Sequence, residues 1–330
     1  MSPSGTSGVS VLLPGWADEA SALPHPAPLI EPVEVAVGNA LGYSFKTNSA
    51  IPGALCLWKA ANGKNPAPEN LVCADPVHLI AGSDDAQLVP IERLNLTIEE
   101  SSAFVAELNE ALGDSDSVFL HDTAGQWYYQ GRITAALDTA PTSAVEGHPM
   151  TTALPRTDEA KPWRSLWSET QMALHGSKVN QARQARGEPV INSLWFWGAG
   201  PMPADVPATV SGGFSRSRCV LYTDSRFAQE LAAAAGVAHF PLQASDGLTL
   251  AESEYEQHLF LDVSLLSNNP DFVEQRELGA LWSERIATMT AGVVNVSAEL
   301  NGLTGCRTVF VPQAHKTASV LTRLAKLFTR

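Results

Sequence analysis

The sequence predicts an α/β protein with a mainly parallel sheet and a smaller α+β part within the chain. The first observation is a nearly continuous apolar run at 190–197, which is typical of a strand buried on both faces. The second is that strand and helix patterns alternate from 190 to 290, which favours a parallel sheet covered by helices. The third is the region 71–140, where a helix and a hairpin follow one another without that alternation.

The composition supports a folded protein and limits its partners. The chain has 330 residues, enough for one large domain or two ordinary ones. Hydrophobic residues make up 45% and charged residues only 17%, which argues against disorder. The formal net charge of −14 disfavours nucleic acid and anionic membranes as partners.

The sequence also predicts a cytoplasmic protein. No stretch approaches the roughly 20 apolar residues that a membrane span requires. The first residues carry no basic segment of a signal peptide. The four cysteines are widely scattered and form no CxxC pair, which argues against a zinc knuckle and favours buried thiols in a reducing compartment.

The first 140 residues contain three predicted elements. Residues 9–13 form a short buried strand that ends at a Pro-Gly turn, and 63–70 is a break rich in Pro and Asn. Thr97 and Glu100 form a capping box, and apolar residues at helical spacing predict a helix up to Gly113. Residues 117–133 then form a hairpin.

The region 139–186 connects this module to the next strand. Its first part, 139–163, is polar, carries four prolines and is predicted to be a loop or crossover. Residues 164–186 are predicted to be helical with a break at Gly176.

The remaining elements follow the α/β alternation. Strands are predicted at 190–197, 218–223 and 258–263. A helix ended by Gly236 follows the second of these strands, and a long helix at 271–289 follows the third. The chain then forms a hairpin around Asn301-Gly302, and a basic amphipathic helix covers 315–330.

These elements predict two domains. Residues 1–63 and 190–330 form the α/β core, so that the two ends of the chain meet in one domain. Residues 64–189 form an inserted α+β domain and the crossover.

Two polar groups are candidates for chemistry in the middle of the chain. Asp75 and His78 are three residues apart and could bind a metal or exchange protons. The alternative is a strand end with Asp75 in an Asx-type turn before Pro76.

The second group consists of polar residues of the predicted helical region. It contains Glu169, Gln171, His175, Asn180 and Arg183. Such side chains suit a carboxylate or phosphate group, so that the expected ligand is small and anionic or phosphorylated. The alternative is a hydrogen-bonded contact between helices.

Asn192 opens the apolar strand at 190–197, and its amide needs a partner because an unpaired buried amide costs roughly 1–3 kcal/mol. We expect Asn180, Arg183 and Asn192 to face a cleft between the two domains, with Arg183 as the cation that receives an anion. The alternative is that Arg183 pairs with Glu188 or Glu169 at the surface.

Several motifs between about 70 and 240 recur in a known order. They are ADPVHL at 74–79, ELNEAL at 107–112, WYYQGRI at 127–133, WSETQMALHGSKVNQARQARG at 167–187 and VINSLWFWGAGPMP at 190–203. The chain thereby resembles a proteobacterial family of regulatory or phosphoglycerate-mutase-like proteins. That family is similar to the archaeal-type 2,3-bisphosphoglycerate-independent phosphoglycerate mutases. The resemblance implies an alkaline-phosphatase-like core with an inserted α+β domain, and phosphoryl transfer through a phosphoserine with two Mn or Zn ions.

The sequence departs from that family at the catalytic positions. Ala54 stands where the nucleophilic serine is expected. Of the expected metal ligands, Asp262 is retained, whereas Asp18 is displaced and His315 is at most a remnant. The resemblance therefore implies a protein without catalytic residues or cofactor that binds or regulates, with no protein partner indicated. The alternative is a divergent metal-dependent phosphoglycerate mutase or phosphoesterase with a site rebuilt from the polar residues between Asp75 and Arg183.

Overall fold

The computed structural model divides the chain into two units that are described separately. One unit comprises residues 1–45 and 205–330, and the other comprises 46–204. The structure describes residues 7–14, 33–43, 45, 51–62, 67–82, 85–131, 133, 137–145, 150–201, 208–210, 213–263, 272–291, 293, 296–301 and 307–310.

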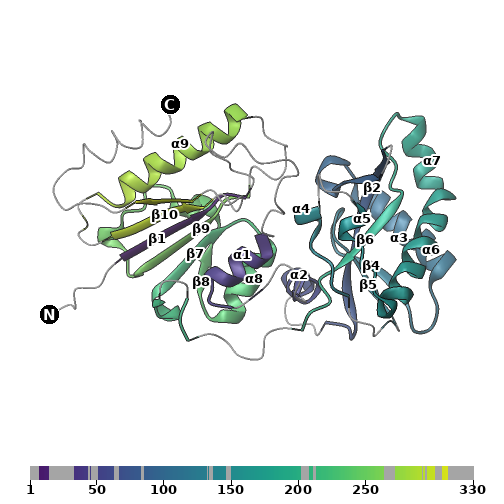
Figure 1. The fold of residues 1–330 in the computed structure, drawn as a ribbon, viewed down its shortest axis with the longest axis horizontal. Coiled ribbons are helices and arrows are strands. Elements are labelled where there is room, and N and C mark those ends of the chain that lie inside the picture. Colours follow the sequence, from purple (N-terminus) through teal and green to yellow (C-terminus); the bar gives the residue numbers. More distant parts are fainter. Residues whose placement is uncertain are drawn as a thin grey trace. The chain divides into compact units, whose positions relative to one another are not determined.

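The first unit is built on a mainly parallel sheet of six strands in the order β11-β10-β1-β9-β7-β8 (Figure 1). Only the pairing of β10 with β11 is antiparallel. The strands are β1 (Ser7–Leu12), β7 (Cys219–Thr223), β8 (Ala238–Phe240), β9 (Gln257–Leu261), β10 (Val296–Asn301) and β11 (Arg307–Phe310).

Among the described residues, the helices beside this sheet are α1 (Val33–Ala40), α8 (Arg226–Ala235) and α9 (Phe272–Met289). Trp282, Ile286 and Met289 of α9 pack in one core cluster with alternate residues of the strands, such as Val9 and Val11. Helices α1 and α8 lie together away from α9 (Figure 1). The alternation predicted from the sequence therefore does form a parallel sheet.

The second unit is built on an antiparallel sheet in which β2 pairs with three other strands. Its strands are β2 (Leu71–Ala81), β3 (Ala86–Val89), β4 (Val118–His121), β5 (Trp127–Gln130) and β6 (Ser193–Trp197). Its helices are α2 (Gly53–Asn62), α3 (Ile98–Leu112), α4 (Thr142–Val145), α5 (Met150–Ala153), α6 (Lys161–His175) and α7 (Lys178–Ala185).

Capping groups fix the ends of several helices where the sequence predicts them. At the start of α3, Thr97 Oγ1 accepts from Glu100 N at 3.1 Å, and Glu100 Oε2 accepts from Thr97 N at 3.2 Å. The chain leaves α6 at Gly176, and Ser177 caps α7. Gly236 ends α8 in the left-handed conformation. The predicted capping box and both glycine stops are confirmed.

The prediction that residues 190–197 belong to the parallel sheet is wrong. Strand β6 pairs antiparallel with β2, from Cys73 opposite Trp197 to Val77 opposite Ser193. Strand β6 is fully buried, as the apolar run predicts, and helix α6 packs against it. An apolar run reports burial and says nothing of strand direction.

Two other expectations need correction. The second unit runs from 46 to 204 and so includes α2 and β6, which the boundaries at 64 and 189 exclude. Asp75 and His78 lie inside an eleven-residue strand, with no strand end or turn between them.

The predicted helix at 315–330 lies outside the described residues. None of the helices in the described part of the chain has the length and apolar character needed to cross a membrane.

Candidate functional site

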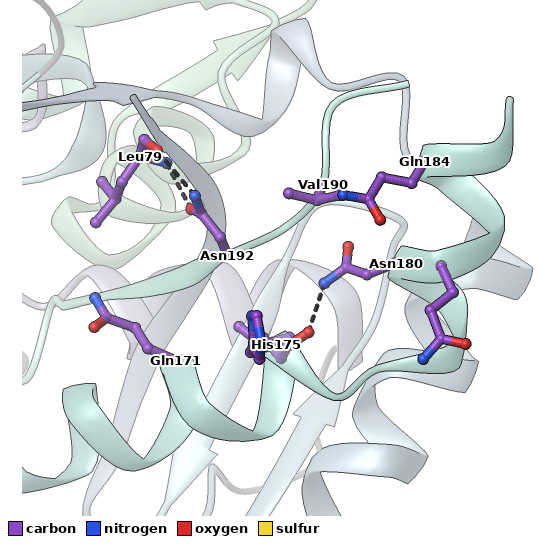
Figure 2. Close-up of a pocket in the computed structure, with 9 residues that line it drawn as sticks. Leu79, Gln171, His175, Asn180, Gln184, Val190 and Asn192 are labelled. Atoms are coloured by element: carbon purple, nitrogen blue, oxygen red, sulfur yellow. Dashed lines mark hydrogen bonds between the residues drawn. The ribbon is translucent and has the colours of Figure 1, made fainter. Parts of the chain in front are cut away.

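A pocket of about 380 Å³ lies in the second unit, beside helices α6 and α7 (Figure 2). Five side-chain amides and one imidazole line it, together with three aliphatic side chains. No carboxylate, lysine or arginine is among these lining residues, which are Leu79, Gln171, Leu174, His175, Asn180, Gln181, Gln184, Val190 and Asn192.

The turn between α6 and α7 brings polar residues from two helices to one place. Ser177 Oγ accepts from Asn180 N at 3.2 Å and so begins α7 just after α6 has ended. Gln171 and His175 are four residues apart and share a face of α6. Figure 2 places both of them near Asn180 and Asn192.

Asn180 is buried and joins three backbone segments. Its Nδ2 donates to Leu174 O at 2.8 Å and to Ile191 O at 2.7 Å. Its Oδ1 accepts from Ile191 N at 2.9 Å. These bonds fix the end of α6 against the segment that leads into β6, so the amide holds the pocket wall in place.

Asn192 closes the opposite side of the pocket in the same way. Its Oδ1 accepts from Leu79 N at 2.7 Å, and its Nδ2 donates to Leu79 O at 2.9 Å (Figure 2). The side chain thus pairs with β2 as a peptide group would. The predicted need for a partner is confirmed, and that partner is the protein backbone.

The remaining polar side chains of the pocket have free hydrogen-bonding groups. Gln171 Nε2 donates to Ser193 Oγ at 3.2 Å, which leaves its carbonyl oxygen available. The side chains of His175, Gln181 and Gln184 are exposed and make no hydrogen bond within the described part of the chain. The pocket therefore has a fixed wall and a rim of unpaired amides.

Arg183 does not line the pocket, contrary to the expectation that it receives an anion. Its side chain is fully buried. The guanidinium donates to Glu100 Oε2 at 2.6 Å, to Leu94 O at 2.5 Å and to Pro189 O at 2.8 Å. The ion-pair alternative fits better, although its main partner is Glu100 and the pair is buried.

A second arginine extends this ion pair to the surface. Arg186 bonds to Glu100 and lies 2.7 Å from Glu188 Oε2. The hydrogen bond from Arg186 lowers the pKa of the Glu188 carboxyl. Glu188 lies 3.6 Å from Arg183. Glu169 takes no part in this network, since it is exposed and accepts a hydrogen bond from Ser165 at 3.0 Å.

Asp75 and His78 do not form a pair. They are three residues apart on one strand, so their side chains leave opposite faces of the sheet. Asp75 Oδ2 accepts from Trp197 Nε1 at 2.6 Å and from Thr142 Oγ1 at 3.2 Å. His78 Nδ1 lies 2.8 Å from Val190 O.

Ala54, the position where the resemblance expects a nucleophilic serine, is inaccessible to solvent. Ala54 is fully buried in the first turn of α2, and its N–H donates to Gly198 O at 3.1 Å. Gly198 has a φ of +74°, and a Cβ built on it would lie 2.9 Å from Ala54 N. The two backbones therefore approach too closely for a side chain at Gly198.

The described residues do not fit the two metal ions that the resemblance implies. Asp262 follows β9, is buried, and accepts from Trp282 Nε1 at 2.9 Å. Among the residues that the structure describes, no group of three His, Cys, Asp or Glu side chains could hold a metal. Asp18 and His315 lie outside the described residues.

Sequence reasoning therefore found part of this site. Of the eight residues singled out, four line the pocket: Gln171, His175, Asn180 and Asn192. It missed Gln181 and Gln184, although a helix carrying uncharged amides three residues apart was a usable signal.

Comparison with solved structures finds two chains that resemble this one to different degrees. The PH0037 protein from Pyrococcus horikoshii is 15% identical over 91% of this chain and 82% of that chain, with a TM-score of 0.51. A cofactor-independent phosphoglycerate mutase from Thermoplasma acidophilum is 15% identical over 98% of this chain and 99% of that chain, with a TM-score of 0.40. No family model and no curated protein matches the chain. The likeness to the PH0037 protein shows a shared fold only.

Proposed function

We propose that this chain is a non-catalytic binding or regulatory protein built on the frame of the cofactor-independent phosphoglycerate mutases. The sequence motifs support the frame, and with it the alkaline-phosphatase-like core. One observation supports the loss of catalysis: Ala54 has no nucleophilic atom and is fully buried.

The surroundings of Ala54 support this proposal beyond the missing hydroxyl. A nucleophile has to reach its substrate and a base that takes its proton. The amide of Ala54 is instead bonded to Gly198 O, and its neighbour Gly53 has no space for a side chain beside Trp197. Restoring serine at this position alone would therefore not create a reactive group.

The rebuilt-site alternative receives less support from the geometry. It requires Asp75, His78 and Arg183 to converge on one ligand. Asp75 and His78 lie on opposite faces of β2, and the guanidinium of Arg183 contacts protein groups at three of its nitrogens. The contacts of these three residues stabilise the fold and do not form a reaction site.

The test is a mutase assay on the purified full-length chain with Mn²⁺ or Zn²⁺ supplied, next to an active cofactor-independent mutase as the positive control. We expect no turnover, and elemental analysis should find less than one metal ion per chain. The variant Ala54→Ser should show no phosphoserine by intact mass after incubation with 3-phosphoglycerate. Turnover of about 1 per second or more, which is ordinary for an enzyme, would overturn the proposal.

A further inference from the structure

We infer that the pocket between α6 and α7 binds a neutral small molecule of about monosaccharide size that carries hydroxyl or amide groups and a non-polar face. This inference rests on the proposed binding function and names the ligand class of the binding site. It departs from the anionic ligand expected from the sequence.

The charge of the surroundings argues against an anion. No lysine or arginine belongs to the lining residues, and the whole chain has a formal net charge of −14. Arg183, the cation expected to receive the anion, is fully buried and bonded to Glu100 and two backbone carbonyls. A phosphate in this pocket would meet amides and an imidazole but no fixed positive charge.

The polar groups of the rim match a ligand that both donates and accepts. Each glutamine amide offers two N–H donors and one acceptor oxygen. Gln171 keeps its carbonyl oxygen free, and Gln181 and Gln184 make no hydrogen bond within the described residues. Hydroxyl and amide groups can satisfy such a mixed set, whereas an ionised carboxylate only accepts and a phosphate accepts at most of its oxygens.

The pocket wall is rigid and partly apolar. Asn180 and Asn192 are held by five hydrogen bonds to backbone groups, so little ordering is required when a ligand enters. Leu79, Leu174 and Val190 supply aliphatic surface. The volume of about 380 Å³ is at the lower end of small-molecule sites, which limits the ligand to roughly one ring.

The experiment observes side-chain amide resonances of the ¹⁵N-labelled full-length protein. The neutral probes are N-acetylglucosamine, glucose and myo-inositol, each up to about 50 mM, because ligands of this size bind weakly. The anionic probes are inorganic phosphate and 3-phosphoglycerate. We expect at least one neutral probe to shift the amides of Gln171 and Gln184 in a saturable way, and neither anion to do so.

Matched variants assign the response to the pocket. Gln171→Leu combined with Gln184→Leu should weaken the binding of that probe at least tenfold. Gln87→Leu is the control, because Gln87 is an exposed glutamine of β3 in the same unit. Intact binding in the double variant, a saturable response to the anions, or no response to any neutral probe would each overturn the inference.

The two proposals can fail separately. Mutase turnover with a normal pocket response would overturn the absence of catalysis and leave the ligand class standing. Absence of both turnover and pocket response would overturn the ligand class alone.

Discussion

Arg183 shows how a residue suited to ligand binding can serve the fold instead. Its guanidinium connects α7 to the capping box of α3 through Glu100, and to the segment before β6 through Pro189 O. The side chain of Arg183 is fully buried, and its hydrogen bond to Leu94 O is buried too, whereas the bonds to Glu100 and Pro189 O are partly buried acceptor contacts. Removing the guanidinium would leave them without their partner.

We therefore predict that Arg183→Met lowers the free energy of unfolding by roughly 3 kcal/mol or more. Urea denaturation of the full-length protein measures this change. The matched control is Arg186→Met, which removes a half-exposed arginine from the same network and should cost less than about 1 kcal/mol. Equal losses in the two variants would contradict the structural role of Arg183.

His258 is a buried titratable group in the first unit. It lies on β9, is fully buried, and its Nε2 lies 2.8 Å from Ser253 Oγ. Burial lowers the pKa of His258 from 6.5 to about 4, because the imidazolium loses its hydration. The unfolded chain thus takes up a proton at a higher pH than the folded protein does.

The sign of the pH effect follows from this difference. The contribution of His258 to stability is complete above pH 6.5 and is lost as the pH falls from 6.5 toward 4. The loss amounts to at most roughly 3 kcal/mol. We predict that His258→Gln flattens the pH dependence of the unfolding free energy in this range. Parallel curves for wild type and His258→Gln would contradict the prediction.

At the scale of elements, side chains bond the backbone carbonyls of β6 on the edge that no strand of the described residues pairs with. Trp167 Nε1 donates to Leu194 O at 2.7 Å, and Thr139 Oγ1 donates to Phe196 O at 2.6 Å. Because these carbonyl oxygens already accept side-chain hydrogen bonds, they are not available to pair with a further strand. The two tryptophans of β6 are themselves bonded, Trp195 to Ala140 O and Trp197 to Asp75.

We predict that Trp167→Phe destabilises the protein by about 1–3 kcal/mol more than Trp58→Phe does. Both substitutions remove an indole N–H and similar ring area. Trp167 leaves a buried carbonyl without its donor, whereas Trp58 Nε1 makes no hydrogen bond in the described part of the chain. Thermal unfolding of the two variants gives the comparison, and equal losses would show that the edge bond contributes nothing.

The sequence predicted elements better than it predicted their partners. The capping box at Thr97, the break at Gly176 and the stop at Gly236 depend on neighbours in the chain, and all three were predicted. The pairing of β6 with β2 joins residues more than a hundred positions apart. Hydrophobic pattern reports burial and contains no information on such pairing.

The same limit applies to the candidate site. Residue types suggested a polar cluster, and His175, Asn180 and Asn192 do meet at one pocket. The role of Arg183 depends on its ion pair with Glu100, which lies on another helix. The capping box of Glu100 has a local sequence signal, but this ion pair has none. Which polar group is free for a ligand is therefore decided by tertiary contacts.

At the scale of the whole molecule, the second unit has the size and internal connections of an independent domain. It spans residues 46–204, within the usual range of domain sizes. Strand β2 pairs with β3, β5 and β6, all of which belong to the same unit. Helix α2 also packs against β2, and Gly53 at its start contacts the ring of Trp197.

We predict that a fragment of residues 46–204 folds by itself, with cooperative thermal unfolding and the near-ultraviolet circular dichroism of packed tryptophans. The control is a fragment of residues 64–189, the boundaries expected from the sequence, which lacks α2 and β6. Without β6, one edge of β2 loses its partner and Trp167 loses its acceptor at Leu194. The shorter fragment should therefore show no cooperative transition. A cooperative transition in the shorter fragment, or none in the longer one, would show that the unit boundaries drawn from the structure do not mark a folding unit.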